Sequence, residues 1–127
     1  MEYGRDYIMR LIKQLVRALI SVIFNKKGTI EYEMPINDQI TSGRDVYALL
    51  VEMADAGDIN GAENRLYEEI EAGIPNVYQM ALAFYDHIND YDDAFLEEHG
   101  FSREEIVQGV RNIAEKLGYG SMVDALL

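Results

Sequence analysis

Apolar residues recur every three or four positions along most of this 127-residue chain. That spacing is the period of an amphipathic α-helix. It predicts helices over residues 6–25, 42–56, 58–72, 75–88, 92–98, 102–117 and 122–127. The connector 28–41 differs, because Ile30, Tyr32 and Met34 alternate with polar residues there. We expect an extended arm in this connector, with strand pairing across a dimer as the alternative, since a lone strand has no independent stability.

The segment 1–27 is a long amphipathic helix whose apolar face widens toward its C-terminal end. A helix that is apolar nearly all round requires burial on more than one side. The predicted surface for a partner or for self-association consists of Leu15, Leu19, Ile20, Ile23 and Phe24. The opposite, basic face consists of Arg10, Lys13 and Arg17.

Three arrangements would bury this first helix. It can pack onto its own chain with the basic residues as an outer rim, or it can pack in a symmetric dimer or against another protein. It can also lie on an anionic membrane, as basic amphipathic helices do. The acidic remainder of the chain would be repelled by such a membrane, which argues against the third arrangement.

Local signals predict where several helices begin and end. Ser42 and Ser102 each stand three residues before an acidic residue, which is the spacing of a capping box. Pro75 suits the first position of a helix. Glycines that can end helices in the left-handed conformation follow three of the predicted helices, at Gly57, Gly73 and Gly118.

Two helical hairpins are expected after the connector. The turn sequence at 57–62 reappears in altered form at 89–94, and the spacing is close to the 34-residue period of tetratricopeptide repeats. These hairpins resemble such repeats, although the second copy has a short second helix and no glycine at its turn. The alternative is generic antiparallel hairpins in a compact bundle. The predicted fold is all-α: one domain over 1–127, divided into the helix 1–27, the connector 28–41 and acidic hairpins over 42–127.

The charge of the chain is −12 at neutral pH, and six of its 11 basic residues lie in 1–27. This balance disfavours nucleic acid as a partner, because phosphate binding requires a basic surface. The chain has no cysteine, so disulfides and thiolate metal sites are excluded. The apolar run at 16–24 is too short to span a bilayer and is not followed by a cleavage signal. A cytoplasmic location is expected.

The polar residues give weak indications of chemistry. His87 and His99 have acidic neighbours, but their spacing does not match a known metal motif. The segment 86–97 has the length of a calcium-binding loop. However, it has Ile88 where the loop needs an oxygen ligand and Tyr91 where the loop needs a glycine. No nucleophile or phosphate-binding motif is found, so the chain is predicted to be no enzyme and to hold no cofactor.

Two further features concern surfaces. The acidic runs at 68–71 and 90–93 are expected on solvated faces and at helix starts. Alternatively they receive a basic partner, such as the polar side of the first helix. Tyr67, Tyr78 and Tyr85 are expected either to line a groove between the hairpins or to lie at the margin of the core.

The segments 6–13, 56–67 and 95–106 together resemble a family of small, uncharacterised helical proteins from Gram-positive bacteria. The resemblance covers nearly the whole chain and is lowest in the connector. It implies a bacterial cytoplasmic protein and transfers no functional residues.

The predicted function is a non-catalytic protein–protein interaction or adaptor module, which binds another protein or itself through the hairpin grooves and the first helix. The first alternative is a peripheral membrane protein held by that helix. The second is a metal-binding protein or enzyme that uses the histidines and carboxylates.

Overall fold

The computed structural model describes residues 2–27 and 38–126, and within these ranges it contains helices and no strand. The all-α prediction is therefore confirmed. The helices of the described residues are α1 (Glu2–Lys27), α2 (Asp38–Asp55), α3 (Ile59–Ala72), α4 (Val77–Asn89), α5 (Asp93–Glu98), α6 (Arg103–Leu117) and α7 (Gly120–Leu126).

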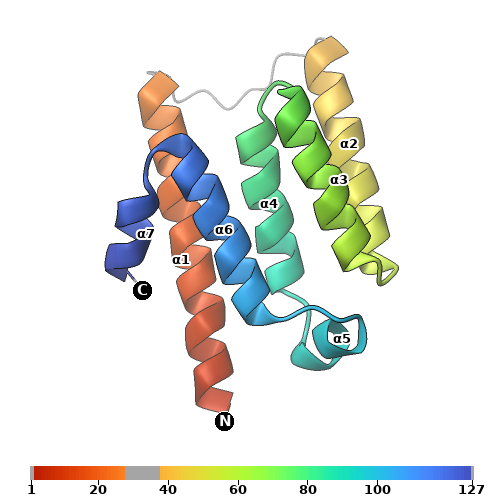
Figure 1. Ribbon diagram of the computed structural model, residues 1–127, viewed down its shortest axis with the longest axis vertical. Helices are drawn as coiled ribbons and strands as arrows, with labels where there is room; N and C mark the ends of the chain where they lie inside the picture. The colour runs from red at the N-terminus through yellow and green to blue at the C-terminus, as the bar shows by residue number, and fades with distance from the viewer. Residues whose placement is uncertain (1, 28–37, 127) are drawn as a thin grey trace.

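Helix α4 stands at the centre of the molecule (Figure 1). The α2–α3 hairpin packs on one side of it, and α1 and α6 pack on the other. Helix α7 packs against α6, and α5 lies at the end of the bundle where α4 finishes. Because α4 has neighbours on both sides, eight of its 13 residues are buried.

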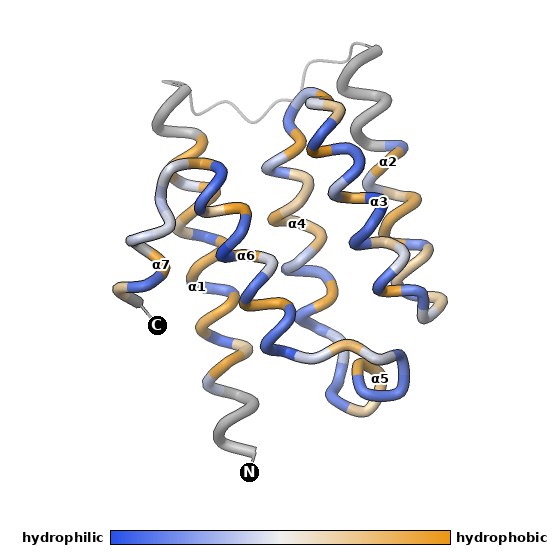
Figure 2. Tube along the Cα trace, viewed as in Figure 1, coloured by the Kyte–Doolittle hydropathy of each residue, from blue (hydrophilic) through white to orange (hydrophobic). Residues whose placement is uncertain are grey.

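The core consists of the apolar stripes that the sequence predicts. Hydrophobic and hydrophilic segments alternate along α1, α4 and α6 (Figure 2), and the hydrophobic positions meet between these helices. Ile12, Leu15 and Leu19 of α1 have no exposed surface, and neither do Phe84 of α4 and Ile113 of α6. Helix α1 is thus part of the core of its own chain, with its polar side facing outward.

Four predicted helix boundaries are confirmed in detail. The side chain of Asp58 accepts a hydrogen bond at the start of α3, and Gly73 ends that helix with a positive φ of 70°. Asp92 caps α5. Ser102 and Glu105 form both hydrogen bonds of the capping box at the start of α6. These signals act through neighbouring backbone atoms, so the sequence reports them directly.

Other predicted boundaries are wrong. Helix α2 begins at Asp38 rather than at Ser42, so the last part of the connector is helical; an acidic residue is favoured at a helix start by the helix dipole. Pro75 lies in the turn before α4, because Asn76 adopts the left-handed conformation and serves as the N-cap. Asn tolerates this conformation better than most residues. The expected arm at 28–37 lies outside the described residues.

The second predicted hairpin also differs from the expectation. Helix α5 is as short as the helix predicted at 92–98, but it does not pack along α4 as the second arm of a hairpin. Helix α4 packs instead against α1 and α6 on that side. The first hairpin, α2–α3, is present as predicted.

Candidate functional site

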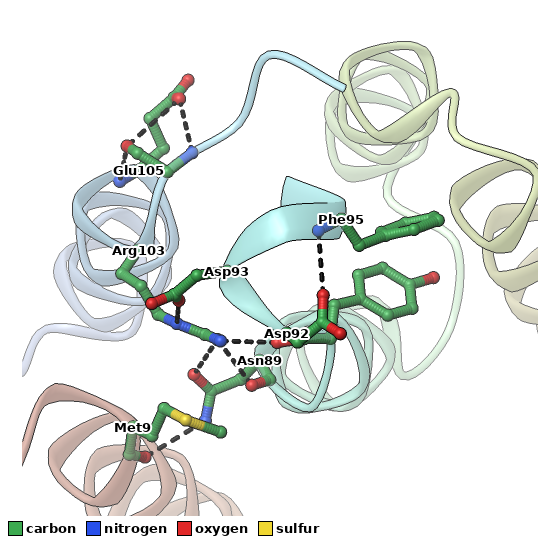
Figure 3. Close-up of polar contacts among 9 residues, drawn as sticks. Met9, Asn89, Asp92, Asp93, Phe95, Arg103 and Glu105 are labelled. Carbon is green, nitrogen blue, oxygen red and sulfur yellow. Dashed lines mark hydrogen bonds and ion pairs between the residues drawn. The ribbon is translucent and has the colours of Figure 1, made fainter. Parts of the chain in front are cut away.

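The most buried polar group of the described residues is centred on Arg103 (Figure 3). Its Nη1 donates to the backbone carbonyl of Asn89 at 2.6 Å and to the Asn89 side chain at 3.1 Å. Nη2 donates to the carbonyl of Tyr91. Nε lies 3.2 Å from Asp93, with which Arg103 forms an ion pair. The Asn89 side chain in turn donates to the carbonyl of Met9 at 3.1 Å.

This Arg103 centre joins α1, α4, α5 and α6. Asn89 has no exposed surface and Arg103 is 7 % exposed, so neither is open to a ligand. Their hydrogen-bonding groups already have partners within the chain, as buried polar groups require. The centre is part of the scaffold.

A second cluster joins the ends of α2 and α4. The hydroxyl of Tyr91 donates to Asp55 Oδ1, and Nε2 of His87 lies 2.9 Å from the same oxygen. The bonds from Tyr91 and then from His87 hold the pKa of Asp55 below its usual value. Burial and the bond to Asp55 raise the pKa of Tyr91. The Asp55 side chain is 53 % exposed, so this cluster is a group of surface hydrogen bonds that links the end of α2 to the end of α4.

The two histidines lie at opposite ends of a row of aromatic rings. The row continues from His87 through Tyr91 and Phe95 to His99, each ring in contact with the next. His99 packs against Gly57, where a Cβ atom would come within 2.5 Å of the imidazole. Among the described side chains, no three histidines or carboxylates are grouped as metal ligands would be.

Four acidic residues of the segment 86–97 have contacts within the chain. Asp86 and Asp90 lie 3.2 and 3.0 Å from the Lys13 ammonium. Asp92 accepts from the backbone of Phe95, and Asp93 pairs with Arg103. The alternative that an acidic run receives the polar side of the first helix is therefore confirmed for Lys13.

The predicted partner surface on α1 is mostly covered by the same chain. Leu15 and Leu19 are fully buried, Ile23 is 6 % exposed, and Ile20 is partly buried against the core. The side chain of Phe24 lies outside the described residues. A partner could reach these residues only if α1 separated from α4 and α6.

The residues of the predicted basic face of α1 differ in their exposure and in their partners. Arg10 and Arg17 are exposed. Burial works to lower the pKa of Lys13, but hydrogen bonds to Asp90 and Asp86 raise it on balance. No helix in 2–27 or 38–126 has the length and hydrophobicity needed to cross a bilayer.

The third cluster lies where α3, α4 and α6 meet, and it contains two of the predicted tyrosines. Tyr85 donates to Glu63 at 2.6 Å, and its hydroxyl lies 3.4 Å from that of Tyr67. Asn112 of α6 donates to the Tyr67 hydroxyl at 3.2 Å. Tyr85 itself is fully buried, and the ring fits because residue 109 is glycine: a Cβ there would lie 2.3 Å from Tyr85 Cζ. Tyr78 is partly buried against the core.

The surroundings of Glu63 in this cluster disfavour its negative charge. Burial raises the pKa of Glu63, the hydrogen bond from Tyr85 opposes that change, and the nearby Glu105 carboxylate adds to it. Burial and the negative charge of Glu63 raise the pKa of Tyr85. The phenol therefore stays protonated as a donor to Glu63, and the nearby charge that acts on Glu63 is the negative Glu105.

A hollow opens to solvent beside these hydroxyls. It has a volume of about 290 Å³ and is lined by Tyr67, Asn112, Glu115 and Lys116. We call it the tyrosine hollow. Its lining combines an aromatic ring, an amide, a carboxylate and an ammonium, which are groups that recognise polar side chains.

Sequence reasoning missed Arg103, Asn89, Glu63 and Gly109. Arg103 follows a helix cap and Glu63 stands next to Asn64 in a helix with many polar residues, so both are expected from the sequence to be solvated. The glycine inside the α6 pattern was the one available signal, since a glycine within a helix costs stability unless packing requires it.

The comparisons with other proteins concern the chain as a whole. No curated protein and no solved structure matches it. A family model matches residues 2–118, from the start of α1 to the glycine that ends α6. This match confirms the expectation of an uncharacterised family. The chain belongs to the family of unknown function DUF6483.

Proposed function

We propose that this protein is a non-catalytic protein–protein interaction module that receives a segment of its partner at the tyrosine hollow. The observation that carries the proposal is the hollow itself, which Tyr67 of α3 lines together with Asn112, Glu115 and Lys116 of α6. Its volume of about 290 Å³ is slightly below the usual range for cavities that enclose small molecules. A shallow hollow of this size suits one projecting side chain of a larger partner.

The walls of the hollow are held in place before binding. Asn112 accepts from Gln108 at 3.1 Å and donates to Tyr67. Tyr67 in turn lies against the buried Tyr85 hydroxyl. A surface that is ordered in advance loses less conformational entropy on binding. Tyrosine is also enriched at interfaces, where its ring gives contact area and its hydroxyl gives a polar bond.

The alternatives from the sequence are supported less well. A peripheral membrane role requires the apolar face of α1, which α4 and α6 cover. A dimer through Leu19 and Ile23 requires the same face. The resemblance of the α2–α3 hairpin to tetratricopeptide repeats agrees with an interaction role, because arrays of such repeats present concave binding surfaces.

An affinity capture with matched variants tests the proposal. The wild type, Asn112→Arg and Asn64→Arg are used to capture proteins from cells that produce this protein. Asn112→Arg fills the hollow, whereas Asn64 is exposed on α3 and does not line it. We expect proteins that bind the wild type and Asn64→Arg and are lost from Asn112→Arg. The same proteins on all three chains, or none on the wild type, would contradict the proposal.

A further inference from the structure

We infer that the partner segment presents an arginine side chain to the tyrosine hollow. This inference rests on the proposed function and adds the chemistry of the occupant.

The hollow lies in a region where negative charge exceeds positive charge. Glu115 lines it, and Glu63 lies behind two hydroxyls, those of Tyr67 and Tyr85. Glu105 is close enough to Glu63 to act on its ionisation. The positive charge on the wall is Lys116, whose side chain is exposed and can extend into water. A cation that enters the hollow therefore meets a favourable potential.

Other nearby basic side chains are already engaged. Arg65 of α3 forms an ion pair with Glu69 at 2.8 Å, one turn along the same helix. Arg111 of α6 pairs with Asp124 of α7 at 2.6 Å. Both guanidinium groups therefore already have a carboxylate partner.

The walls favour a guanidinium over an ammonium. The Tyr67 ring forms part of the lining, and a planar guanidinium stacks on an aromatic ring while its edge donates several hydrogen bonds. Acceptors for those bonds are present in the Glu115 carboxylate and the Asn112 amide oxygen. A lysine ammonium is more strongly hydrated and does not stack in this way. The geometry thus points to arginine.

A titration followed by nuclear magnetic resonance tests this inference. The probes are acetyl-Gly-Arg-Gly-amide, the same peptide with lysine, and the same peptide with citrulline, which keeps the shape of arginine without its charge. We expect saturable shifts of the backbone amides around Tyr67 and at 112–116 with the arginine peptide. We expect binding at least about fivefold weaker for the lysine and citrulline peptides.

Two variants make the test specific to the hollow. Glu115→Gln removes the lining carboxylate, and it should weaken arginine binding about fivefold to tenfold. Glu97→Gln is the matched control, because Glu97 is equally exposed but lies on α5, away from the hollow. Equal binding to Glu115→Gln and the wild type would overturn the inference. Equal binding of the three peptides, shifts spread over the acidic surface, or no shifts would also overturn it.

The two proposals fail in different ways. If Asn112→Arg loses its captured partner and the arginine peptide does not bind, the hollow is a docking site for another side chain. The inference is then wrong and the proposed function stands. If capture is unaffected by Asn112→Arg, the proposed function itself is wrong.

Discussion

Arg103 is buried and Glu63 is partly buried on folding, and the surroundings of these two charged side chains have opposite effects. Arg103 exchanges water for the carbonyls of Asn89 and Tyr91, the Asn89 side chain and Asp93. Glu63 has the hydroxyl of Tyr85 and the repulsion of Glu105. Arg103 therefore stabilises the fold, whereas ionised Glu63 opposes it.

We expect Arg103→Gln to lower the free energy of unfolding by roughly 2–4 kcal/mol, because buried carbonyls would lose a charged donor. Arg65→Gln is the matched control, since its surface ion pair is worth less than about 1 kcal/mol. Urea denaturation of the three proteins measures both changes. Similar small losses for the two variants would show that the Arg103 centre does not hold the helices together.

The ionisation of Glu63 predicts a pH dependence of stability. Its pKa is raised in the folded protein above the value of 4.5 for an unperturbed group. The folded state therefore binds the proton more tightly than the unfolded state does, and the resulting stability is lost as the pH rises through the folded pKa. We expect Glu63→Gln to be more stable than the wild type at neutral pH, with the difference disappearing below about pH 4.5.

Denaturation midpoints of the wild type and Glu63→Gln between about pH 4 and pH 7 check this prediction. Glu104→Gln serves as a control on an exposed carboxylate. A wild type that is more stable than Glu63→Gln at neutral pH would mean that the bond from Tyr85 outweighs the cost of burial.

At the scale of elements, α3, α5 and α6 begin where a side chain caps the backbone, whereas packing decides how these helices meet. The approach of α4 to α6 depends on Gly109. The buried Tyr85 ring occupies the place where a side chain at 109 would be. The α2–α3 hairpin ends against the ring row, where His99 lies over Gly57. Both glycines allow a ring and a backbone to come close.

We expect Gly109→Ala to destabilise the protein even though alanine favours a helix by about 1 kcal/mol. Its Cβ would overlap a fully buried ring whose hydroxyl is held by Glu63, and overpacking of this kind costs about 1–3 kcal/mol. Gly120→Ala is the control, because the atom that it would meet belongs to the flexible side chain of Glu115. Thermal unfolding compares the two. A rise in the melting temperature for Gly109→Ala would show that Tyr85 can move.

At the scale of the whole molecule, α1 completes the core on the side of α4 that the hairpin leaves open. Its buried residues contact α4 and α6, and Lys13 and Met9 add polar contacts to α4. The charge contrast between α1 and the acidic remainder is thus partly satisfied within the chain.

We expect a chain without residues 1–27 to lose cooperative unfolding and to bind a hydrophobic dye, because the apolar surface of α4 and α6 would face water. The double variant Arg10→Gln, Arg17→Gln should keep the fold, since both side chains are exposed. Circular dichroism during heating measures both. A truncated chain that still unfolds cooperatively would show that α1 is an appendage, available to a partner or a membrane.

The sequence by itself determined the helical class, the capped starts of α3, α5 and α6, and the apolar stripes that became the core. These properties depend on residues within one or two helical turns of each other, so a local sequence pattern is enough to predict them. The sequence left open whether Tyr67, Tyr78 and Tyr85 line a groove or lie at the margin of the core. Tyr67 lines the hollow, whereas Tyr85 is fully buried and Tyr78 is partly buried against the core.

Only the tertiary structure decided what covers Leu19 and what surrounds Arg103 and Glu63. Each of these answers depends on side chains from helices far apart in the sequence, whose distances no local pattern contains. The first helix could have been buried in three ways with the same amphipathic pattern. Packing against α4 and α6 is the arrangement found, because those helices together present an apolar surface wide enough to cover it.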